Sequence, residues 1–272
     1  MPAYLPDSDA LTTKIAAAFP NNPSKGLPFI VGVVLLSDSS TGAPLAIMDA
    51  AAITGLRTAA GSAASTRALA RSDARILTIL GTGVQADTHL AAISDVAEIS
   101  EARIVGRTPS AARDFVARRQ PHFGFNVVAF DSAQKAIDGA DIVVTATTAP
   151  EPIVQRGWFA PGAHVCAIGS HAPGKRELDT DSVAGVDVLT VDTKAGALAE
   201  AGDLQIPIAE GRLVPERVVE LGSVLNGDVP GRVSPQQVTV YKSVGMAAMD
   251  AAAARLVYDA ASASGIGVRV DF

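Results

Sequence analysis

The chain has 272 residues, 48% of them hydrophobic and 4% aromatic, which suits one large or two modest domains of an α/β protein. Its formal net charge of −6 argues against a nucleic-acid-binding surface, and the single cysteine, Cys166, excludes an internal disulfide and a cysteine-based zinc site. Without a signal peptide or an apolar stretch of membrane-spanning length, we expect a cytoplasmic protein with no membrane partner.

The first seventy residues predict a small domain. Residues 1–30 are expected to be irregular, because prolines recur at positions 2, 6, 20, 23 and 28. A β-hairpin is expected next, with strands at 30–36 and 45–48 joined by a turn. Thr54 can then cap a helix over residues 56–71, whose alanines and glycine would permit the close approach of a neighbour.

Residues 74–85 (ARILTILGTGVQ) read as a buried strand, a glycine turn and the start of a helix. Gly81, Gly83 and Ala86 form the pattern G-x-G-x-x-A. In this pattern the first glycine allows the tight turn, the second lets a pyrophosphate approach the backbone, and the small third residue lets helix and strand pack closely. The following helix N-terminus suits a phosphate. The context therefore favours dinucleotide binding over an ordinary glycine-rich turn.

Strands and helices alternate after this motif, which predicts βαβ units and a parallel sheet. Strands are expected at 76–80, 102–105, 125–130, 141–145, 163–168 and 186–191, and helices at 84–94, 109–119, 132–138, 195–201, 215–226 and 239–263. The last helix should leave the sheet and pack on the first domain. We predict an α/β fold, with a Rossmann-type doubly wound sheet at 71–244 and a discontinuous second domain made of 1–70 and 245–272.

The end of the strand predicted at 102–105, the second strand of the parallel sheet in chain order, bears on the choice of cofactor. An acidic residue there would bind the ribose 2′-hydroxyl of NAD, whereas basic and hydroxyl residues accommodate the 2′-phosphate of NADP. Here Arg107 and Thr108 follow the strand, and the nearest carboxylate, Asp114, lies inside the next helix. NADP(H) is favoured and NAD(H) is possible; a solvated arginine at a strand end is the simpler alternative.

Small and polar residues follow the later strands, where ligands bind in a doubly wound sheet. Thr145, Ala146 and Thr147 end one strand, and His171 closely follows another. His171 can exchange protons near neutral pH, although a lone histidine is often structural. Cys166 lies within an apolar run and is expected to be a buried core thiol.

Two basic residues of the first domain stand out by their surroundings. Arg57 lies in a small, apolar stretch, and Lys14 is isolated among uncharged residues. An arginine fork and a mobile lysine would suit a carboxylate-bearing substrate, while exposed surface charges are the alternative.

The chain resembles the ornithine cyclodeaminase/μ-crystallin family. The matching stretches cover nearly the whole chain in order: LRTAA (56–60), GTGVQA (81–86), ADIVVTAT (140–147), PGAHVCAIGSHAPGKREL (161–178), AGDL (201–204) and YKSVG (241–245). The resemblance implies a Rossmann half, a substrate and dimerisation half, and a homodimer. It also implies a small amino- or imino-acid substrate, interconverted with NAD(P)(H).

By this resemblance, Lys14 and Arg57 would contact the substrate, and His171 would line the site. The expected cofactor-binding residues are Thr58, Gly81, Gly83, Val84, Gln85, Arg107, Thr108, Thr145, Ala146, Thr147, Val165, Cys166, Ala167, Ile168, Lys175 and Ser243. For Val165–Ile168 the backbone is the expected contact. No metal is expected.

Two departures from the family pattern matter. Cyclodeaminases carry an aspartate at the position of His171, in G-x-D-x-P-G-K, where it assists attack on the imine. Family members also usually carry a longer N-terminal segment with a further substrate-binding arginine, so the second domain is expected to be N-terminally shortened.

These observations lead to one main hypothesis and two alternatives. The main one is an NADPH-dependent reductase of a small α-imino acid, such as Δ1-pyrroline-2-carboxylate or the imine of a 2-oxo acid, reversible as an amino-acid dehydrogenase. The second is an ornithine or lysine cyclodeaminase with bound NAD, which Arg107 and His171 disfavour. The third is a non-catalytic NADPH-binding protein of the μ-crystallin type.

Overall fold

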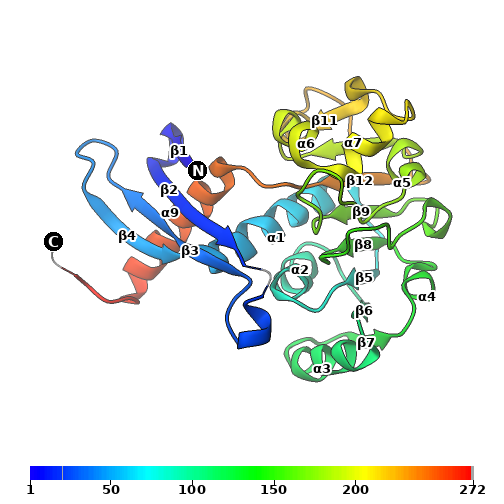
Figure 1. Ribbon diagram of the computed structural model, residues 1–272, viewed down its shortest axis with the longest axis horizontal. Coiled ribbons are helices and arrows are strands. Elements are labelled where there is room, and N and C mark those ends of the chain that lie inside the picture. Colours follow the sequence, from blue (N-terminus) through cyan, green and yellow to red (C-terminus); the bar gives the residue numbers. More distant parts are fainter. Residues whose placement is uncertain (20, 271–272) are drawn as a thin grey trace. The chain divides into compact units, whose positions relative to one another are not determined.

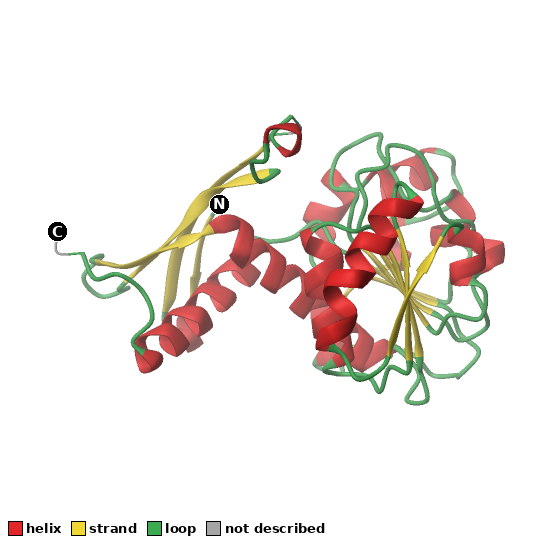
Figure 2. Cartoon of the chain, turned by 90° about the horizontal axis from the view of Figure 1, so that it is seen from below, coloured by secondary structure: helices red, strands yellow, loops and turns green. Residues whose placement is uncertain are grey.

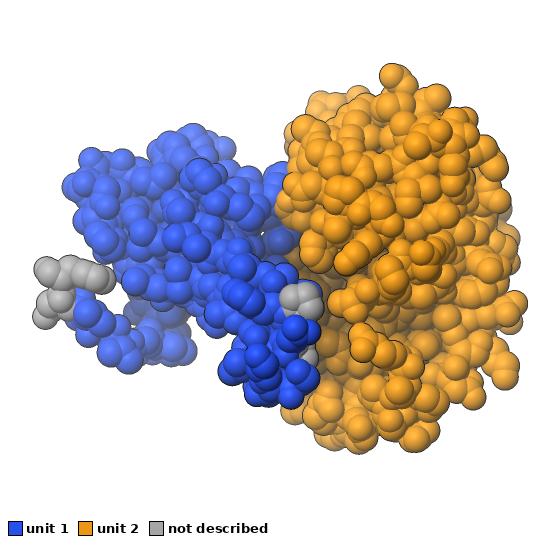
Figure 3. All heavy atoms as spheres, in the orientation of Figure 1, with its two compact units in different colours: residues 1–57, 246–272 blue, residues 58–245 orange. Residues whose placement is uncertain are grey.

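A computed structural model describes residues 1–19 and 21–270, and these divide into two compact units. Unit 1 comprises residues 1–57 and 246–272, and unit 2 comprises residues 58–245 (Figure 3). Unit 1 is thus made of two separate parts of the sequence, and the first division between the units falls inside the helix at Ala50–Leu69. Pro20, placed in the irregular stretch by the sequence, lies outside the described residues.

Unit 1 is a four-stranded antiparallel sheet in the order β1-β2-β3-β4. Its elements are β1 (Pro2–Leu5), β2 (Ala10–Ala18), β3 (Ile30–Ser37), β4 (Pro44–Asp49), the first part of α1 (Ala50–Leu69), and α9 (Ala247–Ser264). The helix α9 packs along β1, β2 and β3, as expected for a C-terminal helix returning to the first domain. The opposite face of the sheet carries no described helix of this unit (Figure 2).

The expectation that residues 1–30 are irregular is wrong. The strand β2 has nine residues, and its residues 11–18 all pair with β3. Long-range pairing therefore overrides weak local propensity. Pro2 begins the edge strand β1 and Pro6 follows its end, positions where a missing N–H is tolerated. The predicted hairpin is confirmed as β3 and β4.

The helix α1 begins at Ala50, six residues before the sequence placed it. Asp49 accepts a hydrogen bond from the backbone N–H of Ala52 at 2.8 Å, as an N-terminal cap does. Thr54 is therefore not the cap. Its hydroxyl donates to the carbonyl of Ala50 at 2.6 Å, one turn back in the helix.

Unit 2 is built on an eight-stranded parallel sheet in the order β11-β10-β12-β9-β8-β5-β6-β7 (Figure 1). The strands are β5 (Ile76–Leu80), β6 (Glu101–Val105), β7 (Asn126–Phe130), β8 (Ile142–Thr145), β9 (His164–Ala167), β10 (Val188–Val191), β11 (Val218–Glu220) and β12 (Thr239–Lys242). The helices are α2 (Val84–Ser94), α3 (Pro109–Arg119), α4 (Ala133–Ile137), α5 (Thr180–Ala184), α6 (Lys194–Glu200), α7 (Gly202–Ala209) and α8 (Leu221–Leu225). Helices cover both faces of this sheet, which confirms the doubly wound α/β class (Figure 2).

Two predicted helices in the last third of the chain are wrong. The expected helix at 215–226 is a 3-10 turn, the strand β11 and the short α8. The expected helix at 239–263 begins only at Ala247, because residues 239–242 form β12, inserted between β9 and β10. All four residues of β12 are buried, and its β-branched and aromatic members favour a strand.

Two buried histidines bear on stability. His89 Nδ1 donates to the carbonyl of Gln85 at 2.7 Å, so its Nε2 accepts from the hydroxyl of Ser62 at 2.9 Å. His164 lies between the hydroxyls of Ser65 and Thr239, at 3.1 and 2.8 Å. Burial lowers the pKa of His89 to about 4 and that of His164 to about 3, from an ordinary value of 6.5.

The free energy of unfolding should therefore fall as the pH drops from about 6.5 toward about 4. In this window the unfolded chain takes up two histidine protons that the folded chain does not bind. His89→Gln should reduce the slope by about 1.4 kcal/mol per pH unit, the contribution of one proton. Urea denaturation at several pH values measures this. The control is His122→Gln, at an exposed site. Equal slopes for His89→Gln and the unmodified protein would contradict the statement that folded His89 stays unprotonated in this pH window.

Candidate functional site

The glycine turn of unit 2 has the geometry that a diphosphate needs. Gly81, directly after β5, has a φ of +131°, and a Cβ there would lie 2.4 Å from the carbonyl oxygen of Ala146, so only glycine fits. Gly83 is the N-cap residue of α2 and makes no side-chain cap. A Cβ at Gly83 would meet nothing within 4 Å, so the space above the helix N-terminus is open. Free N–H groups at such a terminus bind phosphate.

The parallel sheet brings the other predicted cofactor residues to the same edge as this turn. The strands β6, β5, β8, β9 and β12 all end there, because parallel strands point in one direction (Figure 1). Their ends carry the predicted residues that the sequence separates widely: Gly81, Val84, Gln85, Arg107, Thr108, Thr145, Ala146, Thr147, Ala167, Ile168 and Ser243.

Three predicted cofactor residues lie deeper than this edge. Val165 and Cys166 are inside β9 and are fully buried, and Thr58 is buried in α1. Burial raises the pKa of the Cys166 thiol, which lies 3.6 Å from the hydroxyl of Ser65 and 3.4 Å from His164 Nε2. Cys166 is thus a core thiol, as expected, and any cofactor contact from it would involve its backbone.

At the end of β6, the side chains of Arg107 and Thr108 have different kinds of hydrogen-bond partner. Arg107 is exposed, and its guanidinium donates to the hydroxyl of Thr148 at 3.2 Å, a residue that follows β8. The hydroxyl of Thr108 accepts from the backbone N–H of Ala111 at 3.2 Å and so caps α3. Thr108 therefore has a structural role that the sequence did not anticipate, while the exposed Arg107 joins the end of β6 to the segment after β8.

The segment after β9 carries His171 and Lys175 on its exposed part. Within residues 1–19 and 21–270, neither side chain makes a hydrogen bond or ion pair. Ser243, after β12, is buried, and its hydroxyl donates to Asp192 Oδ2 at 2.9 Å. Asp192 also accepts from the N–H of Val244 at 3.0 Å, so it fixes the chain after β12. Asp192 was not among the residues singled out from the sequence.

Unit 1 holds a separate cluster of three buried charges. Lys14, on β2, donates from Nζ to Asp250 Oδ1 at 3.0 Å and to the Thr54 hydroxyl at 2.6 Å. Arg57, on α1, donates from Nε to the same Asp250 oxygen at 3.2 Å. All three charged side chains are at most 9% exposed. The structure thus brings together the two cations that the sequence singled out.

Asp250, which joins the two cations, was not among the residues singled out from the sequence. It lies on α9, and the only signal was an isolated acidic residue in an alanine-rich helix. One carboxylate shared by two cations leaves the cluster with one uncompensated positive charge when all three are ionised. Burial lowers the pKa of Lys14; the Arg57 charge acts in the same direction and Asp250 opposes it. The cluster therefore suits an anionic ligand.

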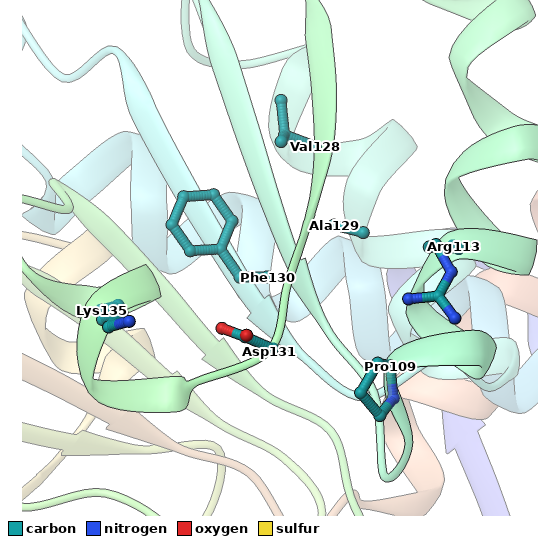
Figure 4. Close-up of a pocket in the computed structure, with 7 residues that line it drawn as sticks. All are labelled: Pro109, Arg113, Val128, Ala129, Phe130, Asp131 and Lys135. Carbon is teal, nitrogen blue, oxygen red and sulfur yellow. The ribbon is translucent and has the colours of Figure 1, made fainter.

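A surface hollow of about 420 Å³ lies beside the edge strand β7 (Figure 4). Arg113 and Lys135 lie on opposite sides of the strand there, with Asp131 between them. None of the predicted site residues lines it, and β7 is the strand farthest from β9 and β12 on that side of the sheet. We assign it no role in the site.

Among the described residues, two kinds of feature are absent. No group of three or more histidine, cysteine, aspartate or glutamate side chains is arranged to hold a metal ion. No helix in that part of the chain is long and apolar enough to cross a membrane.

The fold and the glycine turn define a dinucleotide-binding α/β protein with a second unit that presents buried cations. Residues 1–265 match the family model described as the ornithine cyclodeaminase/mu-crystallin family. The chain belongs to this family.

Individual relatives agree with this assignment. All of the chain aligns, at 37% identity, with a Δ1-pyrroline-2-carboxylate reductase of Bacillus cereus, over 84% of that protein. The ketimine reductase mu-crystallin of Mus musculus is 40% identical over 95% of this chain and 79% of its own. Among solved structures, Thermococcus litoralis Δ1-pyrroline-2-carboxylate reductase in complex with NADH and L-proline has a TM-score of 0.95 and 40% identity, covering 99% of this chain and 84% of that one.

Proposed function

We propose that this protein reduces a small α-imino acid, such as the cyclic ketimine Δ1-pyrroline-2-carboxylate, to the amino acid with a nicotinamide cofactor. Relatives bear the names of such reductases, and one was solved with NADH and proline. The observation that carries the proposal is Arg57. Within the described residues only its Nε is hydrogen-bonded, to Asp250, so its two terminal NH2 groups remain for a carboxylate.

We assign separate roles in this chemistry to residues of the chain. The bound cofactor would supply a hydride to the imine carbon. The glycine turn at Gly81 and Gly83 and the N-terminus of α2 would hold its diphosphate. Arg57 would bind the substrate carboxylate as a fork, and Lys14 would polarise the imine. His171, or a water that it orients, would supply the proton to the nitrogen.

Asp250 explains why both cations can remain buried. A lone buried ammonium or guanidinium loses its hydration and is strongly disfavoured, whereas a shared carboxylate compensates part of that loss. Because the carboxylate is shared, it does not neutralise both cations. The substrate carboxylate would complete the charge balance, so binding favours substrates with an anionic group beside the imine carbon.

The Arg57→Lys variant tests most directly whether Arg57 binds the substrate carboxylate. Lysine keeps the charge but loses the two-pronged contact, worth about 1.5–3 kcal/mol, so the KM for the imino acid should rise about 10- to 100-fold. NADPH and NADH oxidation at neutral pH with Δ1-pyrroline-2-carboxylate measures this. The matched control is Arg255→Lys, an arginine of α9 that pairs with the exposed Asp259.

The rival functions give different results in the same assay. Release of ammonia from ornithine without added cofactor would indicate a cyclodeaminase. Tight NADPH binding without turnover of any imine or amino acid would indicate a binding protein. An unchanged KM in Arg57→Lys would refute the assigned role of this arginine.

For the cofactor, we propose a preference for NADPH over NADH. Arg107 is exposed at the end of β6, and no carboxylate occurs between Val105 and Ala112 to bind a free ribose 2′-hydroxyl. Its present partner is a neutral threonine hydroxyl, so a phosphate would compete well for the guanidinium.

Arg107→Ala should raise the KM for NADPH about 10-fold or more and change the KM for NADH less than about twofold, because only NADPH carries the 2′-phosphate. Parallel steady-state assays with both cofactors measure the split. Arg118→Ala, in the last turn of α3, is the control and should change neither value. Equal losses for both cofactors would show that Arg107 does not select the phosphate.

We also propose that the protein forms a homodimer through the uncovered face of the unit 1 sheet. That face exposes large apolar side chains, each at least 41% accessible: Tyr4, Ile15, Val31, Val33 and Ile47. Ile15 and Val33 are directly paired across β2 and β3, so the exposed side chains form a contiguous patch. Such patches mark association surfaces.

Ile15→Glu should convert the dimer to a monomer, because a charge would be buried in an apolar interface. Size-exclusion chromatography with light scattering gives the mass. The control is Val233→Glu, an equally exposed valine of unit 2, which should leave the mass unchanged. A monomeric unmodified protein at micromolar concentration would contradict the proposal.

A further inference from the structure

Glu177 is a fully buried carboxylate that the proposed chemistry does not use. Its Oε1 accepts from the backbone N–H and the hydroxyl of Thr147, both at 2.7 Å. Its Oε2 accepts from the hydroxyl of Thr145 at 2.7 Å and from the backbone N–H of Gly169 at 2.8 Å. Thus one side chain joins the segment after β8 to the segment after β9, at the carboxyl ends of these strands.

A buried lysine holds the beginning of the same loop. Lys242, at the end of β12, is 1% exposed, and its Nζ donates to the carbonyls of Ala167 and Ser170 at 3.2 and 2.5 Å. It is also paired with Asp203 Oδ2 at 3.2 Å. The Ser170 hydroxyl in turn donates to the carbonyl of Lys175 at 2.5 Å, which ties the two arms of the loop together.

Asp203, in the first turn of α7, holds the end of the loop. Its Oδ1 accepts from the backbone N–H groups of Glu177 and Leu178 at 2.9 and 3.0 Å. The two carboxylates and one ammonium are at most 1% exposed. Burial raises the pKa of Glu177, whereas the Lys242 charge and the hydrogen bonds from Thr145 and Thr147 act against that rise.

The backbones in this region are packed too closely for side chains. A Cβ at Gly169 would lie 2.1 Å from the carbonyl oxygen of Thr147 and 2.5 Å from Glu177 Oε1. Gly81 of the phosphate turn approaches Ala146 in the same way. The glycine turn, the segment after β8, Glu177 and the segment after β9 therefore form one continuous set of contacts.

We propose that Glu177 is a positioning residue that fixes the segments after β8 and β9 so that the nicotinamide half of the cofactor is held at the sheet edge. Lys242 and Asp203 keep Glu177 and the loop base in place. The proposal takes the identity of the cofactor from the proposed function, but it concerns binding and needs no turnover.

Glu177→Gln is a sharp test because it keeps the shape and removes one acceptor. Each carboxylate oxygen accepts from a backbone N–H, that of Thr147 or that of Gly169. Whichever way the amide turns, its NH2 group faces one of these donors. One segment must therefore move.

We expect Glu177→Gln to raise the Kd of NADPH at least tenfold and to change the Kd of 2′,5′-ADP less than twofold. The second probe lacks the nicotinamide half but keeps the adenine and 2′-phosphate end. NADPH fluorescence enhancement gives the first value, and displacement of bound NADPH gives the second.

The control for general destabilisation is Asp141→Asn, at the opposite edge of the sheet. Asp141 Oδ2 also accepts from two backbone N–H groups, of Arg75 and Ile76, at 2.8 and 2.9 Å. Asp141→Asn should lower the free energy of unfolding and leave both Kd values unchanged. If Glu177→Gln does not fold, Glu177→Asp keeps the charge but shortens the side chain by one methylene, so that its oxygens no longer reach the N–H groups of Thr147 and Gly169 together; the NADPH Kd should rise in this variant as well.

Each outcome supports or overturns the positioning role of Glu177. Unchanged NADPH binding in Glu177→Gln, or in Glu177→Asp where that variant replaces it, overturns the positioning role; so does equal loss of both probes, or a matching loss in Asp141→Asn. If the unmodified protein binds NADPH with the expected split among variants but reduces no imine, the positioning role stands and the proposed function fails. If it binds neither NADPH nor NADH, both fail.

Discussion

The parallel direction of the strands in unit 2 is the constraint on which its site depends. Because β5, β6, β8, β9 and β12 all point the same way, the segments that follow them reach one edge, whatever their distance in the sequence. Edges of this kind expose backbone polar groups that need partners. The chain meets part of that need with buried side chains such as Glu177 and Asp192, and it leaves the glycine turn open.

The two units treat buried charge differently, and the difference corresponds to their proposed roles. In unit 2 the oxygens of Glu177 each accept two hydrogen bonds, and Lys242 makes three polar contacts. In unit 1 one oxygen of Asp250 serves two cations, and the ends of Arg57 have no partner among the described residues. A carboxylate whose two oxygens both accept from backbone N–H groups fixes the backbone, whereas a cationic cluster with unpartnered guanidinium ends retains affinity for an anion.

Much of this could be predicted from the sequence, because the informative signals were local. The motif around Gly81 and Gly83 indicated the phosphate turn, and the residue after the second strand, Arg107, was identified from the same pattern. Lys14 and Arg57 stood out because their neighbours are uncharged. These features depend on short stretches whose periodicity and composition agree with the structure that they adopt.

The parts that could not be predicted depend on distant pairing. The strand β2 exists because β3 pairs with it, and β12 because β9 and β10 lie on both sides of it. Asp250 joins Lys14 and Arg57 across more than 190 positions of sequence, so an acidic residue in an alanine-rich helix gave no sign of its partners. Glu177 lay inside a recognised motif, yet its role became visible only once its four donors had positions.

At both the amino ends and the carboxyl ends of the strands in the eight-stranded sheet, a side chain carboxylate accepts hydrogen bonds from backbone N–H groups, but the two carboxylates differ in their consequences. At the amino edge Asp141 accepts from two backbone N–H groups at the start of β5, and His164 is held between hydroxyls at the start of β9. At the carboxyl edge Glu177 binds backbone N–H groups after β8 and β9. Both arrangements stabilise the sheet, but only the second adjoins open space above the glycine turn. The end of the sheet at which a carboxylate lies therefore separates Asp141, which holds only the fold, from Glu177, to which we assign the ordering of a ligand.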